Sequence, residues 1–232
     1  YKTMNFSYEA NQLRAITKIF DQGHIHKGYK PVHWCNDCRS SLALAEVEYK
    51  DKNSDSIYVK FSVVDTDKVA QKCQWLAGEK TLKNLSVVIW TTTPWTLPAN
   101  EAVAVNASYD YVLVQLNDEV IIVAQELMEK LFEALAIDDH QQVASISGKD
   151  LEKLLVQHPF YDKQVPIVLG DHVTLESGTG LVHTAPGHGV EDYQVAQKYN
   201  LPLDYPVGVN GCFAEGTEFF EGLHINKANP VI

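Results

Sequence analysis

Apolar and polar positions alternate along several short stretches of this chain, as they do in half-buried strands. Residues 57 to 63 show this period of two clearly, and residues 85 to 90 form an apolar run of strand length. Asn117–Asp118 is typical of a turn that joins two strands into a hairpin. The remaining strands are predicted at residues 103–105, 111–116, 119–123, 165–169, 173–175 and 181–183.

Other segments repeat their apolar positions with the period of a helix. The most regular is residues 7 to 22, for which Ser7 is the expected N-cap and Gly23 the expected C-cap. The last twenty residues, from Phe213 onward, are punctuated by Gly, Asn and Pro and predict irregular structure. Further helices are predicted at residues 125–136, 149–157 and 190–199.

Many short strands with a few scattered helices predict an α+β fold. We expect a β-barrel-like core of short strands with peripheral helices. Residues 1–45 are predicted to be a separate helical connecting segment that carries a Cys-x-x-Cys pair, and residues 46–232 to be the main domain.

Composition narrows the class of function. The chain has 232 residues, of which 45% are apolar and 21% charged, and no apolar run suggests a membrane span. Its net charge of −11 argues against an autonomous nucleic-acid binder, although one nucleotide at the end of an RNA held elsewhere is compatible with it. The chain starts at Tyr1 without an initiator Met, so we expect a fragment of a larger protein. Four cysteines, one pair of them close, favour a reducing cytoplasm over a disulfide framework.

The first segment with candidate chemistry is Trp-Thr-Thr-Thr-Pro-Trp-Thr-Leu-Pro-Ala-Asn at residues 90–100. A strand must change direction at Pro94, which has no N–H for a sheet, so the threonines before it expose hydroxyls at a sheet edge. Such hydroxyls suit a ribose, an ammonium group or a bound water. The alternative is that the threonines only follow their strand preference and that the prolines end the strand.

The second segment is Gly-Thr-Gly-Leu-Val-His-Thr-Ala-Pro-Gly-His-Gly-Val-Glu-Asp-Tyr at residues 178–193. Its glycines predict tight turns, and Gly189 is a possible N-cap that places Asp192 in the first turn of a helix. Asp192 either stabilises the helix dipole or offers a carboxylate at a pocket rim. His183 is equally compatible with a structural and a pocket role, and His188 is the weaker candidate. If the two segments meet, they enclose a pocket with hydrogen-bonding walls, an anion and an imidazole.

Cys35 and Cys38 form the only Cys-x-x-Cys pair. A structural zinc needs four ligands, and Cys73 and Cys212 stand alone in the sequence. We therefore expect reduced thiols and no metal, with a zinc site on Cys35 and Cys38 as the less favoured alternative.

Three segments together resemble the editing domain of the bacterial-type isoleucyl-tRNA synthetases, which are class I enzymes. These are residues 90–100, residues 178–193, and residues 29–38 with the segment 43–49 that follows them. Valyl and leucyl relatives usually carry Arg where Thr93 stands, which favours the isoleucyl family. The family's nucleotide-binding signatures, of the His-x-Gly-His and Lys-Met-Ser-Lys-Ser types, are absent from these 232 residues, so no ATP use and no cofactor are expected of them.

The resemblance implies that residues 46–232 are an editing domain that hydrolyses valine esterified to the 3′ end of isoleucine tRNA. It implies that Asp192 binds the substrate ammonium and that His183 sets the size limit. Catalysis would fall to Thr92, Thr93 and Asp192, without an identifiable general base. The implied partners are the 3′ end of the aminoacylated tRNA and the remaining domains of a synthetase, with no membrane. The alternative is a module that binds the acceptor end, or a structural insert, without hydrolytic activity. The substrate-binding candidates are Trp90, Thr91, Thr96, Asn100, His183 and Asp192.

Overall fold

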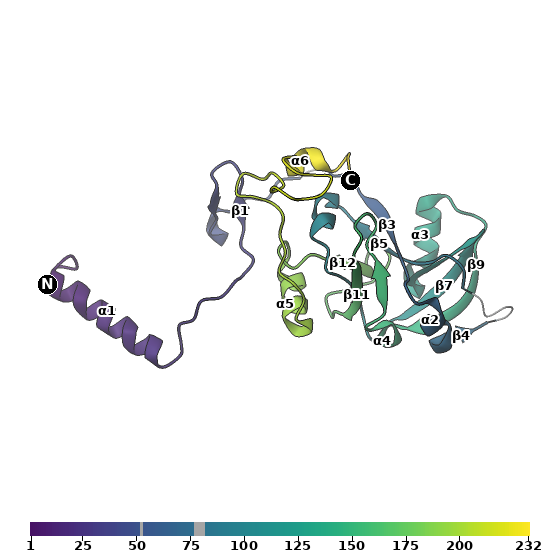
Figure 1. The fold of residues 1–232 in the computed structure, drawn as a ribbon, viewed down its shortest axis with the longest axis horizontal. Helices are drawn as coiled ribbons and strands as arrows, with labels where there is room; N and C mark the ends of the chain where they lie inside the picture. The colour runs from purple at the N-terminus through teal and green to yellow at the C-terminus, as the bar shows by residue number, and fades with distance from the viewer. Residues whose placement is uncertain (52, 77–81) are drawn as a thin grey trace. The chain divides into compact units, whose positions relative to one another are not determined.

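The computed structural model describes residues 1–51, 53–76 and 82–232, which divide into the units Tyr1–Lys30 and Pro31–Ile232 (Figure 1). The first unit contains helix α1 (Phe6–Asp21), close to the predicted bounds. Its N-cap is Asn5 and not the predicted Ser7, because the Asn5 side chain accepts a hydrogen bond from the Ser7 N–H at 3.0 Å. The predicted boundary after residue 45 stays a prediction.

The larger sheet of the second unit has six strands in the order β3-β5-β8-β7-β9-β4. Strands β5 and β8 are parallel, and the other neighbouring pairs are antiparallel. The hairpin predicted at Asn117 is confirmed as β7–β8, and Asn117 takes the left-handed conformation that a tight turn requires. The bounds are β3 Ile57–Ser62, β4 Gln74–Trp75, β5 Leu85–Thr91, β7 Asp110–Leu116, β8 Glu119–Ala124 and β9 Gln141–Ser147.

The smaller sheet has four strands in the order β10-β11-β6-β12. Strand β6 lies in its interior, parallel to β11 and antiparallel to β12. The register places His183 of β12 opposite Val103 of β6. The bounds are β6 Ala102–Val105, β10 Leu155–Gln157, β11 Gln164–Leu169 and β12 Leu181–Thr184.

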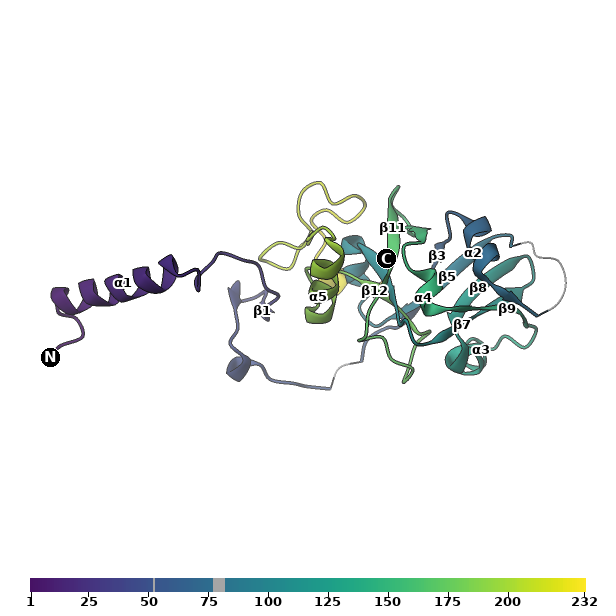
Figure 2. The ribbon, with the colours of Figure 1, turned by 90° about the horizontal axis from the view of Figure 1, so that it is seen from below.

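Apolar packing arranges the second unit in layers (Figures 1 and 2). The main core lies between the two sheets and takes alternate residues of each strand, such as Val87 and Ile89 of β5. Val88 faces the opposite way, into a second cluster beneath α3 (Met128–Leu135). The apolar run of β5 is therefore continuous because both faces of the strand are buried. Helix α5 (Val190–Tyr199) covers the outer face of the smaller sheet through Val195.

The α+β class predicted from the sequence is confirmed, with helices at the periphery of short strands. The two sheets approach each other where Val63, just after β3, bridges to Val156 of β10. Within the described residues, both sheets remain open and their hydrogen bonds do not close into one barrel.

Two predicted elements are wrong. The helix predicted at 149–157 ends early: α4 spans Gly148–Leu151, Lys153 is left-handed, and the chain continues as β10. Pairing with β11 outweighs the helical period there, a tertiary effect that local pattern cannot show. Residues 173–175 do not form the predicted strand: the chain turns at residues 171–172, where the Val173 N–H bonds back to the Gly170 carbonyl, and the Val173 side chain packs against the smaller sheet.

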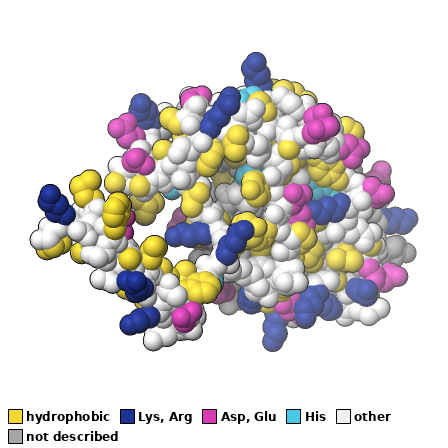
Figure 3. Space-filling view, turned by 60° about the vertical axis from the view of Figure 1, so that its left-hand side comes forward, with side chains coloured by type: hydrophobic (Ala, Val, Ile, Leu, Met, Phe, Trp, Pro, Cys, Tyr) yellow, Lys and Arg dark blue, Asp and Glu magenta, His cyan; other side chains and the backbone are white. Residues whose placement is uncertain are grey.

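Short elements complete the unit. Charged side chains of both signs are interspersed on the face shown in Figure 3. No helix of the described residues is long and apolar enough to span a bilayer. The short elements are β1 Trp34–Cys35, β2 Ser40–Ser41, η1 Leu44–Glu46, α2 Thr66–Lys72, η2 Pro94–Ala99, η3 Gln125–Leu127 and α6 Ile225–Ala228.

Candidate functional site

The two segments singled out in the sequence meet in space and line one cavity of about 320 Å³. Strand β5 ends at Thr91, and Pro94 begins the short helix η2, so the chain turns there as predicted. Strand β12 lies against β5, which brings residues 178–193 to the threonines. The lining residues are Trp90, Thr91, Thr92, Thr93, Thr96, His172, Thr174, Ser177, Gly178, Thr179, Gly180, Leu181, Val182, His183, Ala185, His188 and Asp192.

The threonines at the end of β5 form one wall of the cavity, in which some hydroxyls make hydrogen bonds within the protein and others do not. The buried Thr91 hydroxyl accepts a hydrogen bond from the Thr93 N–H at 3.1 Å, which fixes the turn. Thr92 and Thr93 are exposed, and the Thr92 side chain makes no hydrogen bond to any described residue. Thr92 therefore offers a hydroxyl to a ligand without first breaking a bond within the protein.

His183 is held by a chain of hydrogen bonds that fixes its tautomer. The Asn100 amide nitrogen donates to the Ala102 carbonyl at 2.9 Å and, with its second hydrogen, to His183 Nδ1 at 3.2 Å. His183 Nε2 must then carry the proton, and it donates to Thr96 Oγ1 at 2.8 Å. The Thr96 hydroxyl donates in turn to the Thr93 carbonyl at 2.9 Å.

This arrangement makes His183 a rigid, neutral wall of the cavity. The side chain is 8% exposed, and burial lowers the pKa of its imidazole to about 4, with smaller contributions from His188 and His158. Both ring nitrogens are occupied, so the ring has no free site for proton transfer. Asn100 is fully buried and lies behind His183, outside the residues that line the cavity.

Glycines shape the opposite wall by allowing close approach. Gly178 and Gly180 both have left-handed backbones, as the predicted tight turn requires. A Cβ on Gly178 would lie 3.2 Å from the Trp90 ring, and one on Gly180 would lie 2.3 Å from the Cβ of Ala124. The glycines thus let this wall pack directly on Trp90 and on the end of β8.

Asp192 supplies the negative charge of the cavity. It lies in the first turn of α5, whose N-cap is Gly189 as predicted, and its Oδ2 accepts a hydrogen bond from the Ala185 N–H at 3.0 Å. Burial raises the pKa of this carboxyl, while the bond from Ala185 acts in the opposite direction. None of the ion pairs among the described residues involves Asp192. A ligand cation would therefore offset the desolvation of this carboxylate.

Several lining residues were not singled out from the sequence. His172, Thr174 and Ser177 lie in the turns between β11 and β12 and reach the cavity rim. His172 Nε2 and His188 Nε2 are buried and have no hydrogen-bond partner among the described residues. A histidine that follows Gly170–Asp171 directly after a strand was the available signal for His172.

The cysteine pair lies apart from the cavity, in the β1–β2 hairpin. The Cys38 N–H donates to Cys35 Sγ at 3.2 Å, a bond that closes the hairpin turn. Among residues 1–51, 53–76 and 82–232, no group of three or more His, Cys, Asp or Glu side chains could hold a metal ion. The described residues thus do not provide the four ligands of a structural zinc.

The arrangement limits the chemistry of the cavity. It offers one anion, several hydroxyls and the neutral imidazoles of His183 and His188, which can bind an ammonium group and aim a water. Among the described residues, no hydrogen bond links a lining serine, a lining histidine and Asp192, whose bond is to the Ala185 N–H, so the lining does not form a Ser-His-Asp relay. Any hydrolysis here must rest on positioning and on hydrogen bonds to developing charge.

Comparison with known proteins points to one family. The model of the family described as "tRNA synthetases class I (I, L, M and V)" matches residues 1–184 of this chain. The isoleucine–tRNA ligase of Shewanella pealeana is 51% identical over 99% of this chain, and that of Vibrio parahaemolyticus is 52% identical over 100% of it. These alignments cover 24% and 25% of the two relatives, so the chain spans about a quarter of their length.

Solved structures show the same fold. The editing domain of the cytosolic leucyl-tRNA synthetase of P. knowlesi aligns with a TM-score of 0.52 and 16% identity, over 66% of this chain and 66% of that one. The corresponding P. falciparum domain aligns with a TM-score of 0.51 and 13% identity, over 63% and 68% of the two chains. At these identities the likeness concerns the fold alone.

Proposed function

Because this chain belongs to the class I tRNA synthetases, we propose that it is the proofreading domain of an isoleucine-specific member and hydrolyses valine from mischarged isoleucine tRNA. The relatives that match its full length are isoleucine–tRNA ligases, and its fold is that of synthetase editing domains. The proposal places the chain in the cytoplasm, with the rest of a synthetase and the 3′ end of the tRNA as its partners.

The observation that carries the proposal is that Asp192, His183 and the threonines line one cavity. An aminoacyl ester presents an ammonium group, a side chain, an ester and a ribose. The cavity has a half-buried carboxylate for the ammonium group, a rigid wall for the side chain, and a row of hydroxyls for the ester and the ribose. A structural insert would not need an unpaired carboxylate in a hollow, because burying it raises its free energy.

Size exclusion supplies the specificity. One methylene changes binding in a hydrophobic pocket by only about 1–3 kcal/mol, a range for which isoleucine against valine is itself the known example and which is not a result of this structure. A second pocket with a rigid wall improves on this, because forcing a methylene against a packed side chain costs about 1–3 kcal/mol more. His183 is such a wall, since Asn100 and Thr96 hold its ring from both sides.

Catalysis then rests on positioning. Asp192 binds the ammonium and fixes the acyl group, while Thr92 and Thr93 hold the ribose, the ester or the attacking water. Asp192 does not act as the base, because its charge is engaged by the substrate.

The test is single-turnover deacylation with the 232-residue chain in excess over valyl- or isoleucyl-tRNA(Ile). We expect release of valine and protection of isoleucine. Asp192→Asn keeps an oxygen for the Ala185 N–H but removes the charge, so we expect a loss of about 100-fold. Glu191→Gln is the matched control: it is the neighbouring acid, exposed and outside the cavity, and should leave the rate unchanged. Equal rates for both tRNAs, or full activity of Asp192→Asn, would reject the proposal.

The size limit has its own test. His183→Ala should let isoleucyl-tRNA be deacylated, because the wall that excludes the extra methylene is gone. If isoleucine stays protected in a folded His183→Ala protein, the size limit lies elsewhere in the cavity.

A further inference from the structure

Two imidazoles of the cavity, those of His172 and His188, have a buried nitrogen without a partner among the described residues, and His188 is the one that lies beside the His183 wall. His188 lines the cavity, and its Nε2 is buried and has no hydrogen-bond partner among the described residues. A buried polar nitrogen without a partner costs about 1–3 kcal/mol. A ligand that bonds to this nitrogen therefore recovers a cost that the empty cavity bears.

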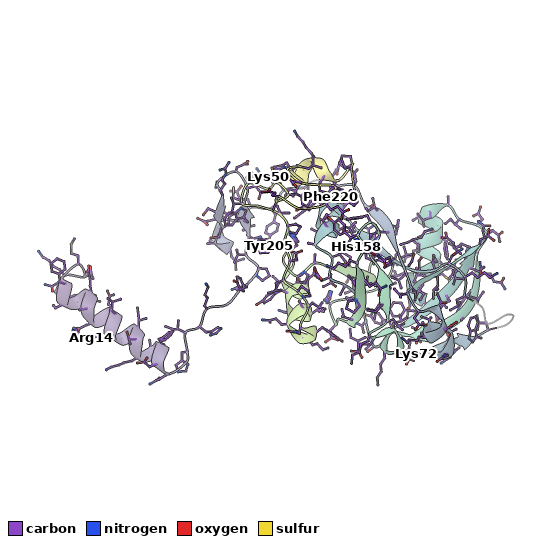
Figure 4. All side chains as sticks on the ribbon, viewed as in Figure 1. Arg14, Lys50, Lys72, His158, Tyr205 and Phe220 are labelled. Atoms are coloured by element: carbon purple, nitrogen blue, oxygen red, sulfur yellow. The ribbon has the colours of Figure 1, made fainter. Side chains whose placement is uncertain are left out.

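The protein holds the His188 ring by packing. The ring lies edge-on to Trp95, with the two ring centroids 5.1 Å apart. The backbone N–H of His188 donates to the Ala185 carbonyl at 2.9 Å. Gly187 lies so close to Tyr205 that a Cβ on the glycine would be 2.5 Å from the Tyr205 Cβ. Tyr205 is labelled in Figure 4. The loop is thus fixed on both sides while Nε2 stays available.

The other two deeply buried histidines of this region are occupied. His183 bonds through both nitrogens, as described above. His158 Nε2 bonds to the Leu97 carbonyl, and its Nδ1 accepts from the Tyr161 N–H at 3.1 Å. His172 also has a free Nε2, but it interacts electrostatically with Asp192, at the ammonium end. His188 interacts with His183 instead, along the wall.

Resting on the proposed function, we infer that His188 is a catalytic residue whose Nε2–H donates a hydrogen bond to the carbonyl oxygen of the ester and to the oxyanion that replaces it. In the tautomer that carries its hydrogen on Nε2, no acceptor among the described residues competes for that hydrogen, so the donor needs no rearrangement before the reaction. Preorganised donors of this kind stabilise developing charge more than flexible or hydrated ones.

The reaction step balances without any further reagent. The water oxygen bonds to the carbonyl carbon, and the C=O π electrons move to the oxygen that His188 holds. When the C=O bond re-forms, the bond between the carbonyl carbon and the ribose oxygen breaks. One proton of the water ends on the ribose oxygen, and valine leaves as the acid, which then loses its proton to solvent.

The charge state of His188 fits a donor and not a base. Burial lowers the pKa of its imidazole to about 4, against a weaker opposing effect of Asp204. The ring is therefore neutral at physiological pH and a poor proton acceptor, but its N–H remains a donor. The rate should accordingly show no ionisation of His188 between about pH 5.5 and 8.

The experiment compares His188→Ala and His188→Gln with the unmodified chain in the single-turnover assay on valyl-tRNA(Ile). We expect His188→Ala to lower the rate at saturating protein by about 100-fold or more, with half-saturation changed less than about twofold. The Gln amide can replace the donor, so His188→Gln should recover at least about tenfold of the loss. His140→Ala is the matched control, since His140 also has a buried ring nitrogen without a partner but stacks on Phe132 outside the cavity.

A binding arm separates this inference from the proposed function. Imidazole ¹⁵N shifts are recorded with and without 3′-deoxy-3′-(L-valylamino)adenosine, in which an amide replaces the ester. If the ¹⁵N signal of His188 Nε2 shifts but the unmodified chain does not hydrolyse valyl-tRNA(Ile), the contact between His188 and the ligand is supported and the proposed hydrolytic function is rejected. Hydrolysis with a fully active His188→Ala protein would reject the His188 role and keep the hydrolase. Neither hydrolysis nor a shift would reject both, and a folded His188→Gln protein as slow as His188→Ala would reject the donor role.

Discussion

Replacing Thr96 by Val tests the hydrogen-bond chain behind the cavity wall. Val has nearly the shape of Thr, so packing is kept and only the hydroxyl is lost. That hydroxyl accepts from His183 Nε2 at 2.8 Å and donates to the Thr93 carbonyl at 2.9 Å. The Thr93 carbonyl keeps a second donor, the Thr96 N–H at 3.0 Å. The His183 Nε2–H, by contrast, has no other acceptor among the described residues.

The expected loss of stability follows from the difference between these two groups: one loses its sole partner and the other keeps a partner. Leaving the buried Nε2–H of His183 without an acceptor costs about 1–3 kcal/mol, because its desolvation is no longer offset. Losing one of two donors to the Thr93 carbonyl adds about 0.5 kcal/mol or less. We therefore expect Thr96→Val to lower the free energy of unfolding by roughly 2 kcal/mol.

The assay is urea unfolding at pH 7, followed by intrinsic fluorescence. Thr92→Val is the matched control, since Thr92 is exposed and makes no hydrogen bond within the described residues, and it should change stability by less than about 0.5 kcal/mol. The slope with urea should be the same in all three proteins. If Thr96→Val is no less stable than Thr92→Val, the hydrogen-bond chain does not hold His183.

Three further predictions concern stability. Three buried histidines have their pKa lowered to about 4: His158, His183 and His188. The unfolded chain takes up protons below about pH 6.5 where the folded chain does not, so the free energy of unfolding should fall between pH 6.5 and 4, and urea unfolding that is flat over this range would contradict the burial argument. Gly180→Ala should lower the free energy of unfolding by roughly 2–4 kcal/mol, because the backbone of residue 180 is left-handed and the new Cβ would collide with the Cβ of Ala124. An unchanged thermal midpoint would refute that contact. Lys163→Met leaves the buried Glu101 without its cation and should cost about 3 kcal/mol in urea unfolding, whereas a neutral result would mean that Glu101 is protonated in the fold.

Local signals in the sequence predicted much of the fold. Strand β5 and the β7–β8 hairpin follow from an apolar run and an Asn-Asp turn, and Gly189 is the N-cap of α5 as expected. The failures lie where distant pairing outweighs local pattern. Residues 155–157 carry a helical period but form a strand, because β11 offers them an open edge.

The candidate site shows the same division. The threonines, His183 and Asp192 could be chosen from residue type and from neighbouring turns, and the structure places them around one cavity. Asn100 could not be placed behind His183 in this way, since the bond between them joins residues 83 positions apart. His172 was missed although it follows Gly170–Asp171 directly after a strand, because that signal marks a turn but does not show toward which side of the sheet the turn points.

Most of the helices and strands, the turns at Pro94 and Gly180, and the kinds of side chain available for chemistry could be predicted from local sequence, because they depend on backbone preferences and on neighbouring residues. Which of the histidines is a wall, and which offers a nitrogen to a ligand, depends on the tertiary structure. That choice depends on burial and on hydrogen bonds from other strands: Asn100 and Thr96 occupy both nitrogens of His183, whereas packing holds His188 and leaves its Nε2 open.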